Sequence, residues 1–475
     1  MNRTGIVATI GPASNTAESI IALRDAGMSM ARLNGSHADL DWHTATIKLL
    51  HETVPDVPIL LDIPGRKIRT VQLAHEPSFE RGEIIILTTS KDHDGSDKVP
   101  VNYDSLHKQL NAGDIILADD GTLRFTVDHV DGQDIHCRAD TAGQLKSRKG
   151  INVPQVKLDT PLVTDRDRQM IKFAKDHGVD YVGISFVESA EHVEAIRALC
   201  DGSTPRIVSK IENQGGLENM AAVIAATDAI MIDRGDLSVE TDLQSVSINQ
   251  KRILNEARES GKPVIVATEV LHSMIENPFP TKAEVSDITN AVLDGGSATM
   301  LSGETAMGKF PIEAVQVMQQ VIATAEDYLQ NTLDGSKTEK STTKVPEAME
   351  AAIAMICRQL PITKIIAITI SGFAARMIAS HQPRQPIVAV SNDAAAARSF
   401  NLLPGTTGEF VDIPFPKDST DHVMECLRIL RDRGRVTDDD LVLITAVGYP
   451  KSGTRMNLIQ THHVGDLVDT LKWDA

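Results

Sequence analysis

A lysine and a glutamate form the most informative pair in the sequence, Lys210 and Glu212 in the segment "RIVSKIE" (206–212). Because they are two positions apart on an expected strand, their side chains point to the same side. The pair could be a simple salt bridge. Alternatively, Glu212 could bind a metal ion with Asp236 while Lys210 neutralises an anionic substrate. A few hard oxygen ligands, without a His or Cys cluster, favour magnesium or manganese.

A second group of charged residues lies in "PILLDIPGRKIRT" (58–70). Asp62 stands near the end of an apolar run, and three cations, Arg66, Lys67 and Arg69, follow it. A carboxylate at a strand end beside cations suggests a site for anions and metal ions. The alternative is a solvated turn after a strand.

A third motif, "RGDLS", follows the apolar run "AIMID" (229–233) and resembles a turn into a helix. The free N–H groups at a helix start could bind a carboxylate or a phosphate. A metal ion, a lysine and an arginine around an anion are the parts that phosphoryl transfer needs, because its catalysis is mostly positioning and charge stabilisation.

Short apolar, β-rich runs alternate with helical patterns such as "NTAESIIALRDAG", which begins with Asn15 as an expected helix cap. Eight such runs predict a (β/α)8 TIM barrel, although a doubly wound sheet would alternate similarly. The expected strands are 5–10, 28–34, 58–63, 181–186, 206–212, 229–233, 263–268 and 298–302.

Active sites of such barrels lie at the carboxyl ends of the strands. Polar and charged residues gather at six of these expected ends, which favours one shared polar site. They are Arg32, Asn34, Asp62, Lys210, Glu212, Asp233, Arg234, Asp236, Thr268, Ser302 and Glu304.

Residues 68–155 lack helical periodicity and are rich in Asp-Gly turns between alternating apolar residues, which predicts a small inserted β-barrel. A polar stretch at 331–344 is typical of a linker, and the segments after it predict a separate C-terminal α/β domain. The expected division is a barrel in two parts (1–67 and 156–330), a lid domain (68–155) and a C-terminal domain (345–475).

Composition excludes several classes of protein. A net charge of -18 over 475 residues makes nucleic acid and anionic membranes poor partners. The four cysteines are far apart without a CxxC pair, which suits a reducing cytoplasm. There is no run of 18 apolar residues to span a membrane, and the first residues do not form a signal peptide.

The motifs together resemble the pyruvate kinase family. The resemblance follows the family order and implies a phosphotransferase that moves phosphate from phosphoenolpyruvate to ADP in glycolysis, with Mg²⁺ or Mn²⁺. It also implies a barrel, a lid and a regulatory domain. The matching stretches are "TGIVATIGPAS", "MARLNGSHAD", "DIPGRKIRT", "KGINVP", "SFVESAEHV", "SKIENQGGLEN", "IMIDRGDL", "KPVIVATEVLHSMIENPFPTKAEVSDITNAVLDG" and "MLSGETAMGKFPIEAV".

The resemblance assigns roles at the substrate. It implies that Lys210 steadies the transferring phosphoryl group and that Glu212 and Asp236 hold the divalent metal ion. The N–H groups of Asp233, Arg234 and Gly235 would bind the substrate carboxylate, and Arg69 would face the substrate phosphate. Thr268 would assist protonation of the enolate, supported by Ser302 and Glu304.

The nucleotide site is implied by the same resemblance. Arg32 would contact phosphate and nucleotide, and Thr9, Asn34 and His37 match positions that line the site for ADP or ATP. Lys149 matches a basic lid residue that closes on the nucleotide. Outside this setting, His37 would be an ordinary histidine at a helix start.

Several residues depart from the family pattern around the expected substrate mouth. Gly35 replaces a phenylalanine, which would loosen its loop, and Asp233 replaces a small residue. Glu188 replaces a cation, and Glu269 and His272 replace an amide and an acid. Two alternatives therefore stay open: a paralogue acting on a modified enolpyruvate or another acceptor, and a catalytically silent sensor on the same fold.

Family members that need potassium carry a glutamate where this chain has Lys67, and potassium-independent members carry lysine. Asn34, Ser36 and Asp62 match ligands of that cation, but Ile63 replaces the usual threonine. A tethered ammonium group can supply the positive charge without a separate binding event. The sequence therefore predicts that potassium is not required.

The C-terminal domain resembles a regulatory domain. "TISGFAARM" (369–377) is similar to a loop that binds a sugar-phosphate effector, and Thr369 and Ser371 could donate hydroxyls to a phosphate. The alternative is a plain β-to-α turn. Because the usual basic residue is missing at Ile370, fructose 1,6-bisphosphate is not the favoured effector. The resemblance also implies a homotetramer.

Overall fold

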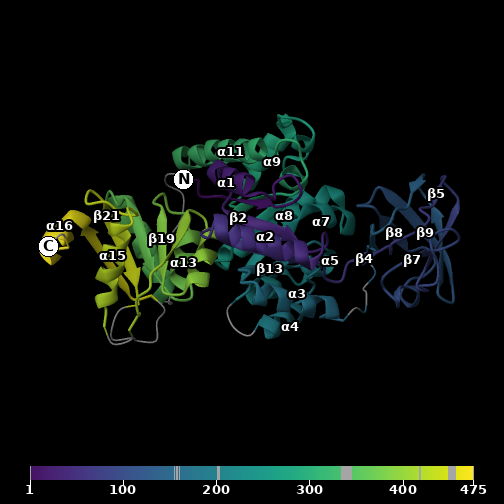
Figure 1. The fold of residues 1–475 in the computed structure, drawn as a ribbon, viewed down its shortest axis with the longest axis horizontal. Helices are drawn as coiled ribbons and strands as arrows, with labels where there is room; N and C mark the ends of the chain where they lie inside the picture. Colours follow the sequence, from purple (N-terminus) through teal and green to yellow (C-terminus); the bar gives the residue numbers. More distant parts are fainter. Residues whose placement is uncertain are drawn as a thin grey trace.

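The computed structural model describes residues 2–154, 156, 159, 161–200, 204–332, 345–416, 419–447 and 456–473. Three parts lie in a row, with the C-terminal domain at one end, a barrel in the middle and a small sheet domain at the other end (Figure 1). Among these described residues, every helix is too short or too polar to cross a membrane. Most of the expected linker, residues 333–344, lies outside the described residues.

Eight parallel strands close into a barrel in the order β1-β17-β16-β15-β14-β13-β3-β2, which confirms the predicted TIM barrel. Its strands are nearly continuous apolar runs because side chains are buried both inside the barrel and under the helices. The strands are β1 Gly5–Thr9, β2 Met30–Asn34, β3 Ile59–Ile63, β13 Tyr181–Ile184, β14 Arg206–Ile211, β15 Ala229–Asp233, β16 Val264–Ala267 and β17 Ala298–Leu301.

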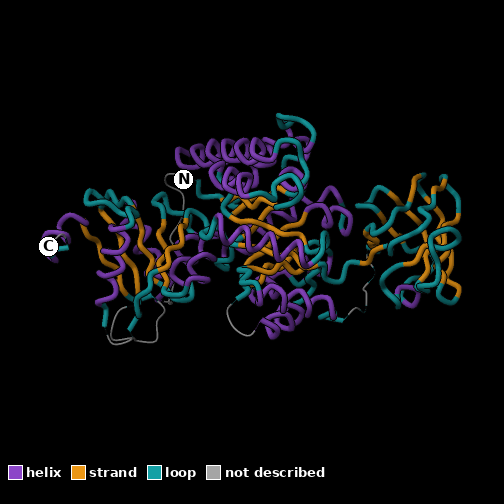
Figure 2. The backbone as a smooth tube through the Cα atoms, viewed as in Figure 1, coloured by secondary structure: helices purple, strands orange, loops and turns teal. Residues whose placement is uncertain are grey.

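Helices surround the barrel (Figure 2). The first of them is capped by the side chain of Thr16, which accepts from the Ser19 N–H, and not by the expected Asn15. The helices are α1 Ala17–Ala26, α2 Leu40–Thr53, α3 Asp165–Asp176, α4 Ala190–Cys200, α5 Gln214–Glu218, α6 Met220–Ala226, α7 Arg234–Glu240, α8 Val246–Glu259, α9 Lys282–Leu293, α10 Gly303–Ala306 and α11 Pro311–Thr332, with 3₁₀ turns η2 Leu243–Ser245 and η3 His272–Ile275.

The sheet domain is inserted after β3, at the carboxyl end of that barrel strand. A seven-stranded sheet runs in the order β4-β12-β8-β9-β10-β6-β7, and a bridge between Thr70 and Val101 brings its two edges together. Strands β5 and β11 form a second small sheet. The elements are β4 Ile68–Arg69, β5 Ser78–Phe79, β6 Ile84–Thr88, β7 Val99–Pro100, η1 Leu106–Lys108, β8 Ile115–Ala118, β9 Leu123–Asp131, β10 Asp134–Ala139, β11 Gly143–Gln144 and β12 Gly150–Asn152.

The C-terminal domain is a five-stranded sheet with helices, in the order β20-β19-β18-β21-β22, of which β22 is the antiparallel edge strand. Apolar clusters lie on both faces of this sheet. The elements are α12 Val345–Gln359, β18 Lys364–Ile368, α13 Phe373–Ser380, β19 Ile387–Ser391, α14 Ala394–Ser399, η4 Phe400–Leu402, β20 Thr406–Phe410, α15 Asp421–Asp432, β21 Leu441–Ala446, β22 Leu458–His463 and α16 Val464–Leu471.

Candidate active site

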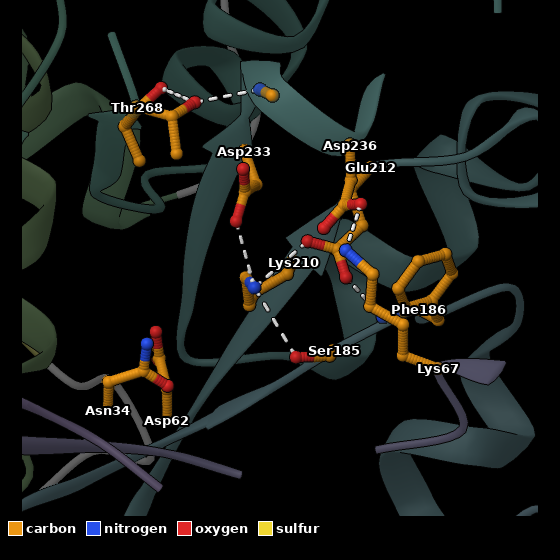
Figure 3. A network of polar contacts seen from close by, with 12 residues as sticks. Asn34, Asp62, Lys67, Ser185, Phe186, Lys210, Glu212, Asp233, Asp236 and Thr268 are labelled. Atoms are coloured by element: carbon orange, nitrogen blue, oxygen red, sulfur yellow. Dashed lines mark hydrogen bonds and ion pairs between the residues drawn. The ribbon is translucent and has the colours of Figure 1, made fainter. Parts of the chain in front are cut away.

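Lys210 lies at the centre of a polar cluster at the carboxyl ends of the barrel strands (Figure 3). Its Nζ is 2.9 Å from Asp233 Oδ2 and 3.0 Å from Glu212 Oε2, and it donates to Ser185 Oγ at 3.3 Å. Burial alone would lower the pKa of Lys210, but the two carboxylates outweigh it and hold this pKa well above its usual value. Lys210 is therefore a permanently charged cation in the barrel mouth.

Three carboxylates face one another around this lysine. Ligand oxygens of Glu212, Asp233 and Asp236 all lie within 4.8 Å of one another. Burial, against the opposing effect of Lys210, raises the pKa of Glu212, and the other two acids add to this shift. Burial also disfavours the charged form of Asp233, but Lys210 and then Lys67 lower its pKa overall. The pKa values of Glu212 and Asp233 are thus shifted in opposite directions within one cluster.

This cluster fits a hard divalent cation. Glu212 Oε1 accepts from the Phe186 N–H at 2.8 Å, whereas Oε2 receives no well-directed hydrogen bond among the described residues and keeps only its ion-pair contact with Lys210. An acceptor-only, all-oxygen donor set is what Mg²⁺ and Mn²⁺ prefer. The carboxylate of Asp233 belongs to the cluster, although the sequence analysis assigned only its N–H group.

Lys67 reaches the cluster from the connection into the sheet domain. Its ammonium forms an ion pair with Asp236 Oδ1 and lies 5.7 Å from the centre of the Phe186 ring. Figure 3 shows Lys67 beside Asp236, apart from Asn34 and Asp62, the matched cation ligands. Lys67 therefore adds its charge to the carboxylate cluster and not to those two residues.

The guanidinium of Arg32 is paired with the carboxylate of Asp62. Its guanidinium donates to Asp62 Oδ2 at 2.8 Å and to Thr9 Oγ1 at 3.1 Å, and Arg32 is buried. Asn34 Oδ1 accepts from the Ser36 N–H at 3.1 Å. Arg32, Thr9 and Asp62 therefore form one connected group.

The other predicted residues of this group differ in exposure. Ile63 is buried, whereas His37 is exposed. Gly35 is held rather than loosened: its N–H donates to Asp62 O at 2.9 Å, and a Cβ at this position would meet the same oxygen at 2.4 Å. A larger side chain would not fit this backbone.

Thr268 stands at the end of β16 in a left-handed conformation with φ 68°. Its Oγ1 accepts from the Gly235 N–H at 2.8 Å, so this expected anion donor is engaged by the threonine. The Arg234 side chain points elsewhere and pairs with Asp287 at 2.6 Å. Glu269 and His272, two departures from the family pattern, are exposed. The structure brings Thr268 and Gly235 together and turns the Arg234 side chain to a supporting ion pair.

Ser302 and Glu304 form a turn after β17. Glu304 Oε2 accepts from the Ser302 N–H at 2.7 Å, and Oε1 accepts from the Leu271 N–H at 3.1 Å. Glu304 thereby joins the ends of two neighbouring strand loops, and Ser302 Oγ is left buried without a partner among the described residues. Glu304 is a buried bracing residue in this arrangement.

Two predicted basic residues lie in the sheet domain. Lys149 Nζ pairs with Asp119 at 2.6 Å, a contact within that domain. Arg69 donates to the carbonyl of Arg148 at 3.3 Å. Among the described residues, these contacts keep both side chains on the sheet domain and not at the carboxylate cluster.

The candidate effector loop follows β18. Thr369 Oγ1 accepts from the Gly372 N–H at 3.0 Å, and Gly372 has φ 77°. Ser371 is exposed, and its carbonyl accepts from Arg376 at 2.9 Å. These contacts build a tight turn at the start of α13.

Sequence reasoning missed Ser185 and Phe186, which lie directly after β13. Ser185 Oγ donates to the Ile63 carbonyl at 3.0 Å and accepts from Lys210, and Phe186 donates to Glu212. The available signals were their place at the end of an expected strand and at the start of the matching stretch "SFVESAEHV". A serine and a phenylalanine carry no charge pattern that would have drawn attention.

The barrel and this site define a class of enzymes. They act on anionic substrates at the carboxyl ends of barrel strands, where a lysine lies among carboxylates. Family models described as "Pyruvate kinase, barrel domain" and "Pyruvate kinase, alpha/beta domain" match residues 1–315 and 347–462.

Among similar proteins, pyruvate kinase of Bacillus licheniformis is 37% identical over 98% of this chain and 81% of its own length. Pyruvate kinase of Mycobacterium intracellulare is 36% identical over 98% of this chain and 99% of its own. A crystal structure of a pyruvate kinase from Cryptosporidium parvum has a TM-score of 0.85 at 31% identity, covering 98% of this chain and 96% of that one. The chain therefore belongs to the pyruvate kinase family, a family of phosphotransferases.

Proposed function

We propose that this protein transfers the phosphoryl group of phosphoenolpyruvate to ADP, giving pyruvate and ATP. The observation that carries the proposal is Lys210, buried between Asp233 and Glu212 with Asp236 beside them. Phosphoryl transfer needs a fixed cation for the moving group and carboxylates for a divalent metal ion. This arrangement supports both within one barrel mouth.

In this proposal, Glu212 and Asp236 hold Mg²⁺ or Mn²⁺, with Asp233 able to join them. The metal ion would neutralise charge on the substrate oxygens. Lys210 is aimed at the same place and would stabilise charge on the transferring phosphoryl group, because its side chain is already fixed by two carboxylates. The remaining protein groups position the substrate.

Protonation of the enolate would take place near Thr268. Its hydroxyl donates to the Ala267 carbonyl at 2.6 Å and accepts from the Gly235 N–H. If the substrate carboxylate binds at the start of α7, the Gly235 N–H would therefore donate to this carboxylate in place of Thr268 Oγ1. Ser302 and Glu304 lie on the next strand end and would support the water that delivers the proton.

Nucleotide binding is proposed at Arg32, Thr9, Asn34 and His37, with Lys149 approaching from the lid, while Arg69 would face the substrate phosphate. Arg32 supports this role because its guanidinium already donates a hydrogen bond to Thr9, another residue of the proposed site. The ion pair of Lys149 with Asp119 would be exchanged for the nucleotide phosphates when the lid closes. The proposed domain limits are those expected from the sequence, with residues 68–155 as the lid.

We infer that potassium is not required. Lys67 supports this, because a fixed ammonium already stands at the carboxylate cluster, and Ile63 offers no side-chain oxygen where the matched ligand set has one. Arg32 also occupies one oxygen of Asp62, a further matched ligand. The positive charge that a bound potassium ion would supply is built into the chain.

A homotetramer in the cytoplasm, regulated by a phosphorylated effector at Thr369 and Ser371, completes the proposal. The tight turn of residues 369–372 supports a small anion site, and the free cysteines Cys137, Cys200, Cys357 and Cys426 suit a reducing compartment. A titration with sugar phosphates and nucleotides would shift the phosphoenolpyruvate curve if this is right. Identical curves would remove the effector role.

The function is tested with a coupled assay of the purified protein, phosphoenolpyruvate, ADP and Mg²⁺. Turnover of about 1–100 s⁻¹, the ordinary range for kinases, is expected. The folded Lys210→Ala variant is the matched control and should be nearly inactive. Turnover far below this range, with every candidate activator present, would instead favour a modified enolpyruvate, another acceptor or a silent sensor.

A further inference from the structure

Phe186 has an unusual backbone for an aromatic residue. It lies directly after β13 with φ 55°, in the left-handed region, which costs about 1–3 kcal/mol for a residue with a side chain. In this conformation its N–H donates to Glu212 Oε1 at 2.8 Å. Its ring also lies 5.7 Å below the ammonium of Lys67. The strained conformation therefore serves two charged residues of the site.

Arg66 holds the loop that carries Phe186. One nitrogen of its guanidinium, Nη2, donates to the Phe186 carbonyl at 3.0 Å and to Glu188 Oε2 at 3.2 Å. The Arg66 side chain is only 7% exposed, whereas that of Glu188 is 38% exposed, so water screens the pair from the Glu188 side. Arg66 thus contacts the loop at Phe186 and at Glu188, one on each side of Val187.

Glu188 is in turn fixed from the next strand end. Its Oε1 accepts from Asn213 Nδ2 at 3.2 Å, and its carbonyl accepts from Asn219 Nδ2 at 2.8 Å. Glu188 is the residue that replaces a cation of the family pattern. A cation at position 188 would repel Arg66, so this ion pair depends on the glutamate that distinguishes this chain.

We propose that Arg66 and Glu188 are positioning residues for the divalent metal ion, acting through Phe186 and Glu212. This inference rests on the proposed function. The ion pair holds Phe186 in its strained conformation, and the Phe186 N–H occupies Oε1 of Glu212. Oε2 then keeps only its ion-pair contact with Lys210, within the cluster that Glu212 forms with Asp233 and Asp236. Without the pair, Phe186 relaxes to an ordinary conformation and its N–H turns away from Glu212.

The pair also connects the metal cluster to the lid. Arg66 stands between β3 and β4, where the chain leaves the barrel for the sheet domain. Lys67, the next residue, contacts Asp236. Loosening Arg66 would therefore disturb both Glu212 and Asp236, from two directions.

The test is Mn²⁺ binding to the substrate-free, full-length protein, followed by the electron paramagnetic resonance signal of free Mn²⁺. Glu188→Gln and Arg66→Met should each raise the dissociation constant about tenfold, as loss of an outer-sphere partner of a metal ligand does. The double variant should also stand near tenfold and not near a hundredfold, because both changes break the same contact. Glu194→Gln, an exposed change on α4, is the matched control and should not alter binding.

Folding is checked by circular dichroism, and the exchanged pair Arg66→Glu with Glu188→Arg provides a second route if a single variant does not fold. The exchanged pair should recover part of the Mn²⁺ affinity lost in the Arg66→Glu variant. Affinities of Glu188→Gln and Arg66→Met equal to the unmodified protein would overturn the inference, as would fully additive losses. If the unmodified protein neither binds Mn²⁺ nor turns over phosphoenolpyruvate, the proposed function itself fails.

Discussion

A buried histidine outside the site should make the barrel sensitive to acid. His192 on α4 is fully buried, and neither of its ring nitrogens has a hydrogen-bond partner among the described residues. Burial, with a smaller contribution from Arg66, lowers the pKa of His192 to about 3. In an unfolded chain the same ring has a pKa of about 6.5. Folding therefore holds this histidine neutral.

The sign and size of the effect follow from proton linkage. Between the two pKa values the unfolded chain binds a proton that the folded chain does not, so stability falls as the pH falls below about 6.5. Each pH unit in this window is worth about 1.4 kcal/mol, so His192 should cost about 2 kcal/mol at pH 5 relative to pH 7.5. Above about pH 6.5, His192 is neutral in both the folded and the unfolded chain, so it no longer lowers the free energy of unfolding.

The assay is urea unfolding at pH 7.5 and at pH 5, followed by the fluorescence of Trp42, which packs against the barrel core. A Trp473→Phe background removes the second tryptophan. Between the two pH values, the free energy of unfolding of the protein with His192 should fall about 2 kcal/mol more than that of the His192→Leu variant. His129→Gln, a change of an exposed histidine, should behave as the unmodified protein. An equal loss with and without His192 would refute the reasoning.

Three site variants give further predictions. Lys67→Glu should lower activity and create a partial potassium requirement, because it places a carboxylate against Asp236; a coupled assay in tetramethylammonium and in potassium buffer measures this, and strong potassium activation of the unmodified protein would contradict it. Lys210→Ala should reduce turnover at least about 10²- to 10³-fold with an unchanged circular dichroism spectrum; near-normal turnover would remove its assigned role. Glu212→Ala should shift the Mg²⁺ titration to higher concentration, and an unchanged titration would exclude it as a ligand.

The barrel could be predicted because its strands are uniform apolar runs. Residues such as Val208 and Met231 must be apolar on whichever side they face, since the helices cover one side and the barrel interior the other. The pairing of Lys210 with Glu212 was also accessible, because alternate residues of one strand share a side. These features depend on spacing within one segment.

The remaining contacts depend on the register between segments. Lys67 reaches Asp236 across 169 positions of sequence, and the Asp233 carboxylate joins Lys210 through the pairing of β14 with β15. The left-handed Phe186 is set by partners from other strand ends, not by its own propensity. Local sequence cannot specify such contacts, so the sequence predicts the positive charge of Lys67 but not its ion pair with Asp236.

The central claim is phosphoryl transfer from phosphoenolpyruvate to ADP without potassium, and phosphorus NMR observes it directly. The unmodified protein is mixed with phosphoenolpyruvate, ADP and Mg²⁺ in tetramethylammonium buffer. The account predicts that the phosphoenolpyruvate resonance is replaced by the γ-phosphate resonance of ATP in equal amount, at close to the rate found with potassium added. A protein that binds Mn²⁺ yet leaves the phosphoenolpyruvate signal unchanged, with and without potassium, would contradict it.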